Sequence, residues 1–249
     1  MLAAATILGS GGFVPTGRRE TSSLLLLPEG GDGAVVVDAG TGIRRLVTDR
    51  GLLQGRTRLD VVLSHFHIDH ICGLAYLTEL GEVDVHVHGP GHALYDTATC
   101  DVLERLFSPP IMPIGLQDIG VHVGDLDLGA TAFGGLEVRT RRQDRHPNPT
   151  FGFRFGDALV WCTDTEDDPG TVDFARGARV LAHDAWGPPA APGHAEPAAA
   201  ARIAAQAGTP SLVLIHVPPL ADEDDLRARA AAEHPHVTVA TDGLALLEL

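Results

Sequence analysis

The chain reads His65-Phe66-His67-Ile68-Asp69-His70 between a predicted strand at 60–64 and a predicted helix at 70–80. Alternate side chains of an extended segment point the same way, so His65 and His67 can reach one metal ion. Where the chain turns into the helix, Asp69 and His70 can face a neighbouring point. The alternative is a run of surface histidines at a helix N-terminus with Asp69 as the cap. Neutral imidazoles rarely cluster in this way without a metal, which favours the metal site.

The composition is that of an ordinary globular protein. Of the 249 residues, 44% are hydrophobic and 20% are charged, which excludes wholesale disorder. We expect residues 1–249 to form a single domain. Apolar runs such as 24–27 are far shorter than the ~20 residues of a membrane span. The N-terminus carries no basic segment typical of an export signal, and the three cysteines form no paired framework, so we expect a cytoplasmic protein without membrane attachment.

The charge balance excludes several kinds of chemistry. Eighteen basic residues, all of them Arg, stand against 33 acidic ones, which gives a net charge of −15. The absence of Lys rules out Schiff-base lysine chemistry and a P-loop lysine. A net charge this negative does not favour long-range attraction of nucleic acid. Histidine, with 13 residues, is unusually frequent.

Strand and helix patterns alternate in two halves of the chain, which favours a layered α/β sandwich. Several predicted strands are continuous apolar runs, as expected for sheets covered by helices on one face and by a second sheet on the other. Predicted helices lie at 41–50, 70–80, 91–106, 196–208 and 222–233. Predicted strands lie at 23–27, 34–38, 60–64, 83–88, 136–140, 151–155, 158–163, 180–184, 212–217 and 237–240.

Further short motifs surround the histidine motif in a fixed order. They are Gly9-Ser10-Gly11-Gly12, Arg18-Arg19, Ser22-Ser23, Val37-Asp38-Ala39-Gly40-Thr41-Gly42, Gly73-Leu74, His146-Pro147, Cys162-Thr163-Asp164-Thr165, Leu181-Ala182-His183-Asp184-Ala185, Gly193-His194 and Leu214-Ile215-His216. With these motifs in this order, the chain resembles the metallo-β-lactamase-fold hydrolases, in particular the branch of tRNase Z and related phosphodiesterases. The resemblance implies an α/β, four-layer αββα sandwich with metals at one edge, between the sheets.

The resemblance also implies a dinuclear metal site. It assigns His65, His67 and His146 to the first metal, Asp69, His70 and His216 to the second, and Asp164 as the bridge between them. Such a pair, about 3.5–4 Å apart, would hold a bridging hydroxide as the nucleophile, with Asp69 also acting in catalysis. Zinc suits this ligand set best, although imidazole and carboxylate also accept Mn or Fe. Asp38 matches a position that could orient a ligand imidazole from behind.

His194 resembles the general acid of the phosphodiesterase branch, which protonates the leaving oxygen. Asp184 matches the acidic residue that orients this imidazole, although Glu is frequent at that position in the family and Asp is shorter. The alternative is that His194 lies in a Pro-rich loop and has no role.

A small or nucleotide-like phosphodiester is therefore the expected substrate, although no substrate-binding residue is identified. Genuine tRNase Z enzymes carry a long arm, usually between the positions that match His146 and Asp164, and here these are 18 residues apart (164 − 146). Together with the negative charge, this disfavours long structured RNA. The alternatives are hydrolysis of a lactone, thioester or β-lactam, or a non-hydrolytic iron-dependent member of the fold in a biosynthetic pathway.

Several other features are left open or set aside. Residues 101–118 could form a pocket wall, a lid or the contact of a homodimer. Alternation along 83–88 indicates that His86 and His88 face away from a core. The remaining histidines without a partner pattern are expected at the surface; they are His92, His122, His234 and His236.

Overall fold

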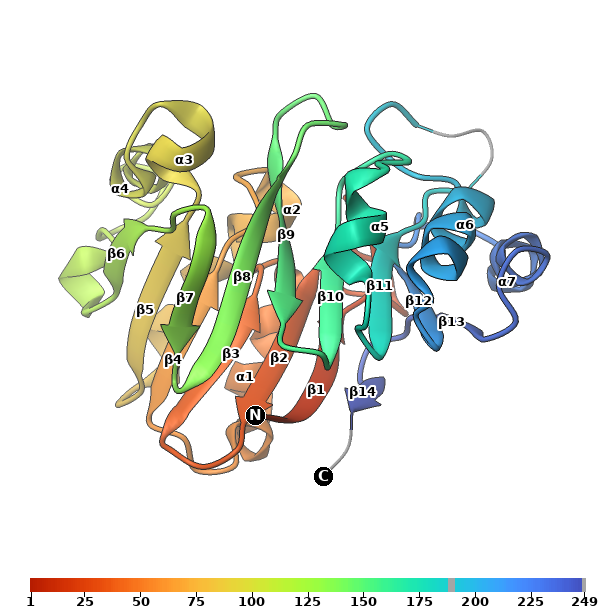
Figure 1. Cartoon of the computed structure of the whole chain (residues 1–249). Coiled ribbons are helices and arrows are strands. Elements are labelled where there is room, and N and C mark those ends of the chain that lie inside the picture. Colours follow the sequence, from red (N-terminus) through yellow and green to blue (C-terminus); the bar gives the residue numbers. More distant parts are fainter. Residues whose placement is uncertain (188–190, 248–249) are drawn as a thin grey trace.

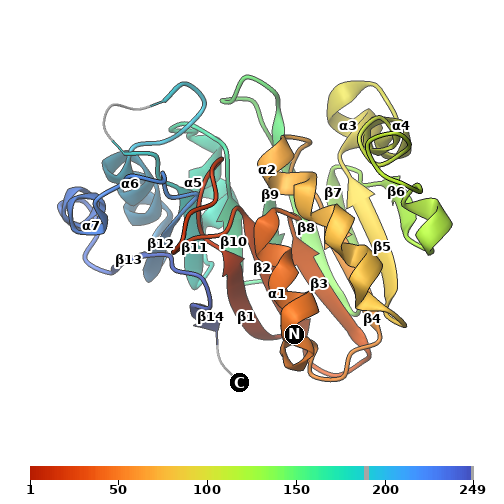
Figure 2. The same ribbon diagram turned by 180° about the vertical axis from the view of Figure 1, so that it is seen from behind.

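The computed structural model describes residues 1–187 and 191–247. The chain forms two seven-stranded sheets that lie face to face, with helices on the outer face of each (Figure 1). Figure 2 shows the same layers from behind. The predicted fold class, an α/β sandwich of two sheets between helical layers, is confirmed.

The first sheet combines the N-terminal half of the chain with its last strand. Its strand order is β14 (Ala245–Leu247), β1 (Leu2–Gly9), β2 (Ser23–Pro28), β3 (Gly33–Val37), β4 (Arg58–Val62), β5 (Asp84–Gly89) and β6 (His122–Asp125). The pairs from β14 to β3 are antiparallel, whereas those from β3 to β6 are parallel.

The second sheet repeats this arrangement. Its strand order is β13 (Val237–Val239), β12 (Ser211–Ile215), β11 (Val180–Asp184), β10 (Leu159–Cys162), β9 (Thr150–Phe155), β8 (Leu136–Gln143) and β7 (Gly129–Phe133). The pairs from β7 to β10 are antiparallel and those from β10 to β13 are parallel. Each sheet therefore has a parallel part, in which the carboxyl ends of the strands meet at one edge.

Short helices form the outer layers. On the side of the first sheet they are η1 (Thr41–Ile43), α1 (Arg44–Thr48), η2 (Arg50–Leu53), α2 (Ile68–Ile71), η3 (Cys72–Leu80), α3 (Gly91–Tyr95), α4 (Thr99–Glu104) and η4 (Gln117–Ile119). On the side of the second sheet they are α5 (Gly170–Ala175), α6 (Pro197–Ala207) and α7 (Glu223–Ala231).

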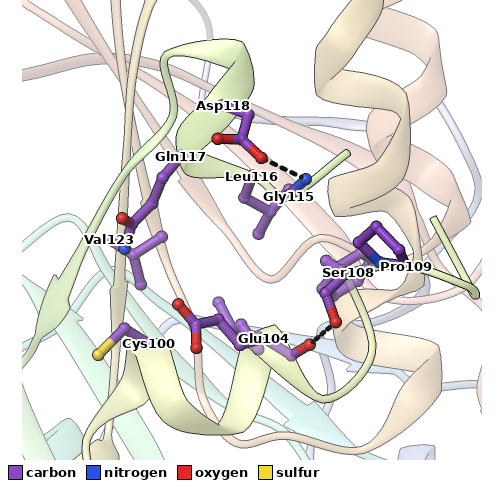
Figure 3. Close-up of a pocket in the computed structure, with 11 residues that line it drawn as sticks. Cys100, Glu104, Ser108, Pro109, Gly115, Leu116, Gln117, Asp118 and Val123 are labelled. Atoms are coloured by element: carbon purple, nitrogen blue, oxygen red, sulfur yellow. Dashed lines mark hydrogen bonds between the residues drawn. The ribbon is translucent and has the colours of Figure 1, made fainter. Parts of the chain in front are cut away.

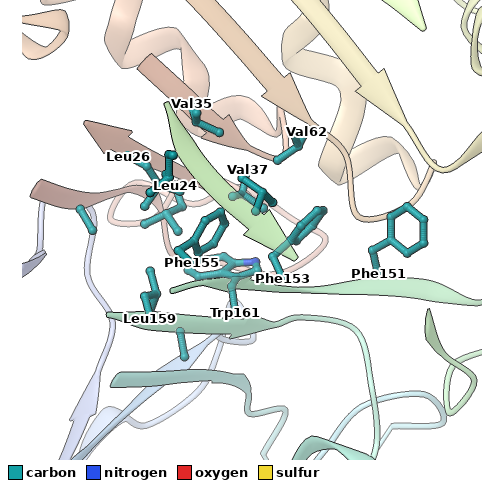
Figure 4. Close-up of a cluster of buried hydrophobic side chains, with 14 of the residues drawn as sticks. Leu24, Leu26, Val35, Val37, Val62, Phe151, Phe153, Phe155, Leu159 and Trp161 are labelled. Carbon is teal, nitrogen blue, oxygen red and sulfur yellow. The ribbon is translucent and has the colours of Figure 1, made fainter. Parts of the chain in front are cut away.

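Alternate residues of each apolar strand enter different cores. Val35 and Val37 of β3 face the second sheet and pack with Phe153 and Trp161 (Figure 4). Val36, between them, belongs instead to the core under the outer helices. Both faces of β3 are thus covered, which explains why its sequence is apolar without alternation.

Several predicted element boundaries are wrong. The helix predicted at 91–106 is broken into α3 and α4, with Asp96 in the left-handed conformation (φ 53°), and most of the helix predicted at 70–80 is the 3₁₀-helix η3. The strands β1, β6, β7 and β14 were not predicted. Three of them lie at sheet edges, where half-exposed side chains give a weak alternation signal.

The histidines that were set aside in the sequence analysis are mostly exposed. His86, His92, His122 and His236 are at least partly exposed, as expected. The prediction for His234 is wrong, because it is buried and its Nε2 donates to the carbonyl of Thr209 at 2.9 Å. Among the residues that the structure describes, no helix is both long enough and apolar enough to cross a membrane.

Candidate metal centre

The histidine motif and its partners gather at the edge where the parallel strands of both sheets end. His65 and His67 follow β4, Asp164 follows β10, Asp184 ends β11 and His216 follows β12. Asp38, Asp164 and His216 each stand just after a strand and have left-handed backbones, with φ of 59°, 49° and 56°. Such backbones are costly for residues other than Gly, and they concentrate at functional sites.

The first cluster joins His65, His67, His146 and Asp164, whose ligand atoms lie within 4.8 Å of one another. Asp164 Oδ1 is 3.8 Å from His65 Nε2 and 3.8 Å from His146 Nε2. His146 Nδ1 donates to the carbonyl of Asn148 at 2.9 Å, so its Nε2 carries the lone pair toward the cluster. His67 Nε2 lies 3.1 Å from Asn148 Oδ1.

The second cluster joins Asp69, His70 and His216. Asp69 Oδ2 is 3.1 Å from His70 Nε2 and 3.2 Å from His216 Nε2. Asp164 reaches this cluster too, because its Oδ2 is 3.1 Å from His70 Nε2. One carboxylate thus faces both clusters: Oδ2 is turned toward His70, and Oδ1, which faces the first cluster, also lies 3.6 Å from His216 Nε2.

Asp38 lies behind both clusters and fixes the orientation of their imidazoles. This fully buried carboxylate accepts hydrogen bonds from His70 Nδ1 at 2.9 Å and from the Ser64 backbone N–H and hydroxyl at 2.7 and 2.9 Å. Because the hydroxyl proton of Ser64 is used there, His65 Nδ1 must donate to Ser64 Oγ, 3.0 Å away. Both imidazoles therefore turn Nε2 toward Asp164.

The electrostatics of the site favour ionised carboxylates. Burial would raise the pKa of Asp164, but the neighbouring His216, His70 and His65 hold it well below its usual value. Burial and the adjacent His70 push the pKa of His65 well below its usual value, which keeps this imidazole neutral. The carboxylates Asp164, Asp69 and Asp38 outweigh burial and raise the pKa of His70. A cation bound here would displace that proton.

The donor atoms fit a divalent metal. Among the described residues, His65 Nε2 and Asp69 Oδ1 are buried without a hydrogen-bond partner. Buried polar atoms without a partner are costly, and an imidazole lone pair beside a carboxylate oxygen is an ordinary metal-ligand combination. The two clusters together offer five imidazoles and two carboxylates.

The predicted acid pair is also assembled here. His194 Nδ1 donates to Asp184 Oδ2 at 2.7 Å, so the shorter aspartate does reach the imidazole. The rings of His194, Trp186 and His216 pack against one another, with centroids 4.9 Å apart for Trp186 and His194, 5.1 Å for His194 and His216, and 5.5 Å for Trp186 and His216. Asp184 is fully buried, whereas the side chain of His194 is 14% exposed. His194 thus combines a fixed Nδ1 with access to solvent.

Three residues of the site were missed by sequence reasoning. Ser64 and Asn148 hold the imidazoles of the first cluster, and Trp186 packs on His194. Each stands within two residues of a predicted site residue, and this proximity is the signal that could have identified them.

Residues 101–118 line a pocket of their own. Its volume is about 190 Å³, and its wall is formed by residues between Cys100 and Val123, including Phe107, Pro109 and Leu116 (Figure 3). None of the predicted metal ligands contributes to this wall. The segment is a pocket wall, although the pocket is not that of the metal clusters; its roles as a lid or a dimer contact stay predictions.

Gly73 allows the start of η3 to lie directly on the loop after β3. A Cβ at this position would stand 2.2 Å from Gly40 O and 2.8 Å from Ala39 O. We expect Gly73→Ala to cost about 1–3 kcal/mol of unfolding free energy, because rigid backbone must move. The measurement is the denaturant midpoint. Gly17→Ala, with open space around its Cβ, is the control and should leave the midpoint unchanged; equal midpoints for all three proteins would contradict this packing.

Comparison with known proteins identifies the family. Residues 34–217 match the family model of the beta-lactamase superfamily domain. The chain is 26% identical to a ribonuclease Z of Methanopyrus kandleri, over 95% of each chain. Its fold matches the crystal structure of the metallo-β-lactamase fold protein YhfI from Bacillus subtilis (TM-score 0.77, 22% identity, 98% and 99% of the two chains). It also matches a diphosphatase of the PhnP family (TM-score 0.76, 21% identity, 99% and 97%). Since the family model spans most of the sequence, the chain belongs to the beta-lactamase superfamily and is a metallo-β-lactamase-fold hydrolase, whose fold implies divalent metal binding.

Proposed function

We propose that this chain is a phosphodiesterase with two divalent metal ions, acting on small or nucleotide-like phosphodiesters. The observation that carries the proposal is the His194–Asp184 pair, held 2.7 Å apart beside His216. A positioned proton donor is needed when the leaving group is an alkoxide. The names of the relatives, a ribonuclease Z and a diphosphatase, support phosphorus–oxygen bond cleavage.

The residues proposed to hold the metals are the five imidazoles and two carboxylates of the clusters. His65, His67 and His146 would bind one ion, Asp69, His70 and His216 the other, and Asp164 both. Zinc suits this nitrogen and oxygen set, and Mn or Fe can also be accepted. When bound, such ions polarise a phosphoryl oxygen and activate water for attack.

The protein's own groups then position and move protons. Asp38 holds Nδ1–H of His70, which keeps the Nε2 lone pair of that imidazole aimed at the cluster. Asp184 accepts Nδ1–H of His194 and stabilises the protonated ring. His194 Nε2–H donates to the departing oxygen as the phosphorus–oxygen bond breaks. Packing of the His194 ring against Trp186 and His216 limits its rotation.

The short connections around the site favour a small substrate. Between His146 and Asp164 the chain consists of β9, β10 and the short segments that join them, which leaves no room for a long arm (Figure 1). The net charge of −15 adds long-range repulsion of polyanions. We therefore propose that long structured RNA is not the substrate.

The three cysteines, all free in the structure, fit a reducing compartment such as the cytoplasm.

The proposed activity predicts metal-dependent hydrolysis of bis(p-nitrophenyl) phosphate. Protein stripped by a chelator should be inactive, and reloading with zinc, manganese or ferrous iron should restore release of p-nitrophenolate. The measurement is the initial rate at equal protein concentration, with circular dichroism to show that the stripped protein stays folded. If folded, reloaded protein has no activity with any of these metals, the phosphodiesterase proposal fails. Turnover of a lactone or thioester by the same samples would then identify a carboxylic substrate.

A further inference from the structure

A second group of metal-ligating side chains lies on the outer strands of the first sheet, on elements separate from the strand ends of the metal centre. Asp84 and His86 belong to β5, and His122 begins β6. His86 and His122 are direct partners in the parallel register of these strands. Their side chains therefore leave the sheet on the same face, and their rings stack with centroids 4.5 Å apart and an interplanar angle of 26°.

Asp84 completes this group. Its Oδ1 is 2.9 Å from His86 Nε2 and 3.9 Å from His122 Nε2. One ligand atom from each of the three residues can be chosen so that all lie within 4.8 Å of one another. The other carboxylate oxygen, Oδ2, is 3.0 Å from His86 Nε2 and 3.7 Å from Arg58 Nη1, so both oxygens of Asp84 face His86.

The neighbouring His88 is not a member of the group. Its Nε2 is 3.1 Å from Oδ1 of the buried Asp60, which also pairs with Arg58. Its ring is 6.3 Å from that of His86. The group therefore has two imidazoles and one carboxylate.

We propose that Asp84, His86 and His122 bind a further divalent transition-metal ion, with zinc preferred. Two imidazole nitrogens and one carboxylate oxygen form a ligand set common for zinc, and they leave a position for water. The side chains of Asp84, His86 and His122 are 50%, 22% and 67% exposed, so the ion can enter and its remaining ligands can come from solvent. This site is independent of the proposed phosphodiesterase activity.

The ion would join an edge strand to its neighbour. In the sheet order β6 stands last and pairs with β5, and residues 101–118 lie on the connection that leads into it. Because the three ligands come together in the folded state, binding stabilises the paired arrangement of β5 and β6. The site thus acts as a clamp on the exposed edge of the first sheet.

Metal stoichiometry tests the proposal in the full chain. The unchanged protein and the variants His122→Ala and His86→Ala are dialysed against buffered zinc, and bound zinc is measured by elemental analysis. The unchanged protein should bind one equivalent more than either variant. His92→Ala is the matched control, since His92 is also an exposed histidine beside a carboxylate (Asp125, 2.5 Å), and no imidazole of the described residues stacks on it. It should bind as much zinc as the unchanged protein.

A second measurement locates the ion. Zinc should slow amide hydrogen exchange in β5 and β6 of the unchanged protein and of His92→Ala, and this slowing should disappear in His122→Ala. Hydrolysis by zinc-loaded His122→Ala should equal that of the unchanged protein, which separates this site from the metal centre. Equal zinc stoichiometry in the unchanged protein and His122→Ala would overturn the proposal, as would unchanged exchange in β6.

Discussion

The His67→Ala protein is expected to bind less metal and to lose at least about 100-fold in kcat/KM for bis(p-nitrophenyl) phosphate. Loss of a residue that merely supports a metal ligand typically costs 10–100-fold, so loss of a ligand itself should cost at least the upper end of that range. His67 stands in the middle of the first cluster, with its ring 4.4 Å from that of His65 and 4.9 Å from that of His146.

The substitution should leave the fold intact. His67 lies outside the strands, at the N-terminal boundary of α2, and makes no side-chain capping bond there. Metal content after dialysis, measured by elemental analysis, and initial hydrolysis rates give the two readouts. His236→Ala, which changes an exposed histidine far along the chain, should match the unchanged protein in both. Full metal content and full activity in His67→Ala would show that the ligand assignment is wrong.

The local part of this site could be predicted because it is encoded in six consecutive residues. A strand that ends in His-x-His and continues into a helix brings His65, His67, Asp69 and His70 together by backbone geometry alone. The apolar runs of 34–37 and 61–63 similarly predict strands that are buried on both faces. The apolar strand patterns therefore predict the fold class, and the histidine motif predicts the four site residues between 65 and 70.

The distant part of the site could not be derived from local patterns. His146, Asp164 and His216 come from three other segments, and their meeting depends on where β8, β10 and β12 end. Asp38, Asp164 and His216 have left-handed backbones, which only a few per cent of residues other than Gly adopt, so no local pattern predicts them at these positions. These residues were placed by the resemblance of their motifs.

The residues that hydrogen-bond to the proposed ligands could not be predicted from the sequence either. Ser64 and Asn148 act through hydrogen bonds to imidazoles, one for Ser64 and two for Asn148, and a serine or an asparagine in a loop has no sequence pattern of its own. The cross-strand stacking of His86 on His122 also needed the register of β5 and β6, since these residues lie far apart in sequence and β6 was not predicted.

His194→Ala should lower kcat for an alkyl phosphodiester by about 10²–10⁴-fold, because a proton donor is lost. Metal content should stay close to that of the unchanged protein, because no proposed ligand is removed. Asp184→Asn should lower kcat in the same direction but less, since an amide oxygen can still accept Nδ1–H, although it stabilises the protonated ring less well than a carboxylate. Both variants are compared with His236→Ala by initial rates and elemental analysis.

The leaving group separates proton donation from a structural role. p-Nitrophenolate departs with little help from an acid, whereas an alkoxide needs its proton as the bond breaks. We therefore expect the loss in His194→Ala to be much larger for an alkyl phosphodiester than for bis(p-nitrophenyl) phosphate. An equal loss for both substrates would contradict the general-acid role. Loss of metal would instead make His194 a ligand, which its place within 4.8 Å of Asp164, Asp184 and His216 would then explain.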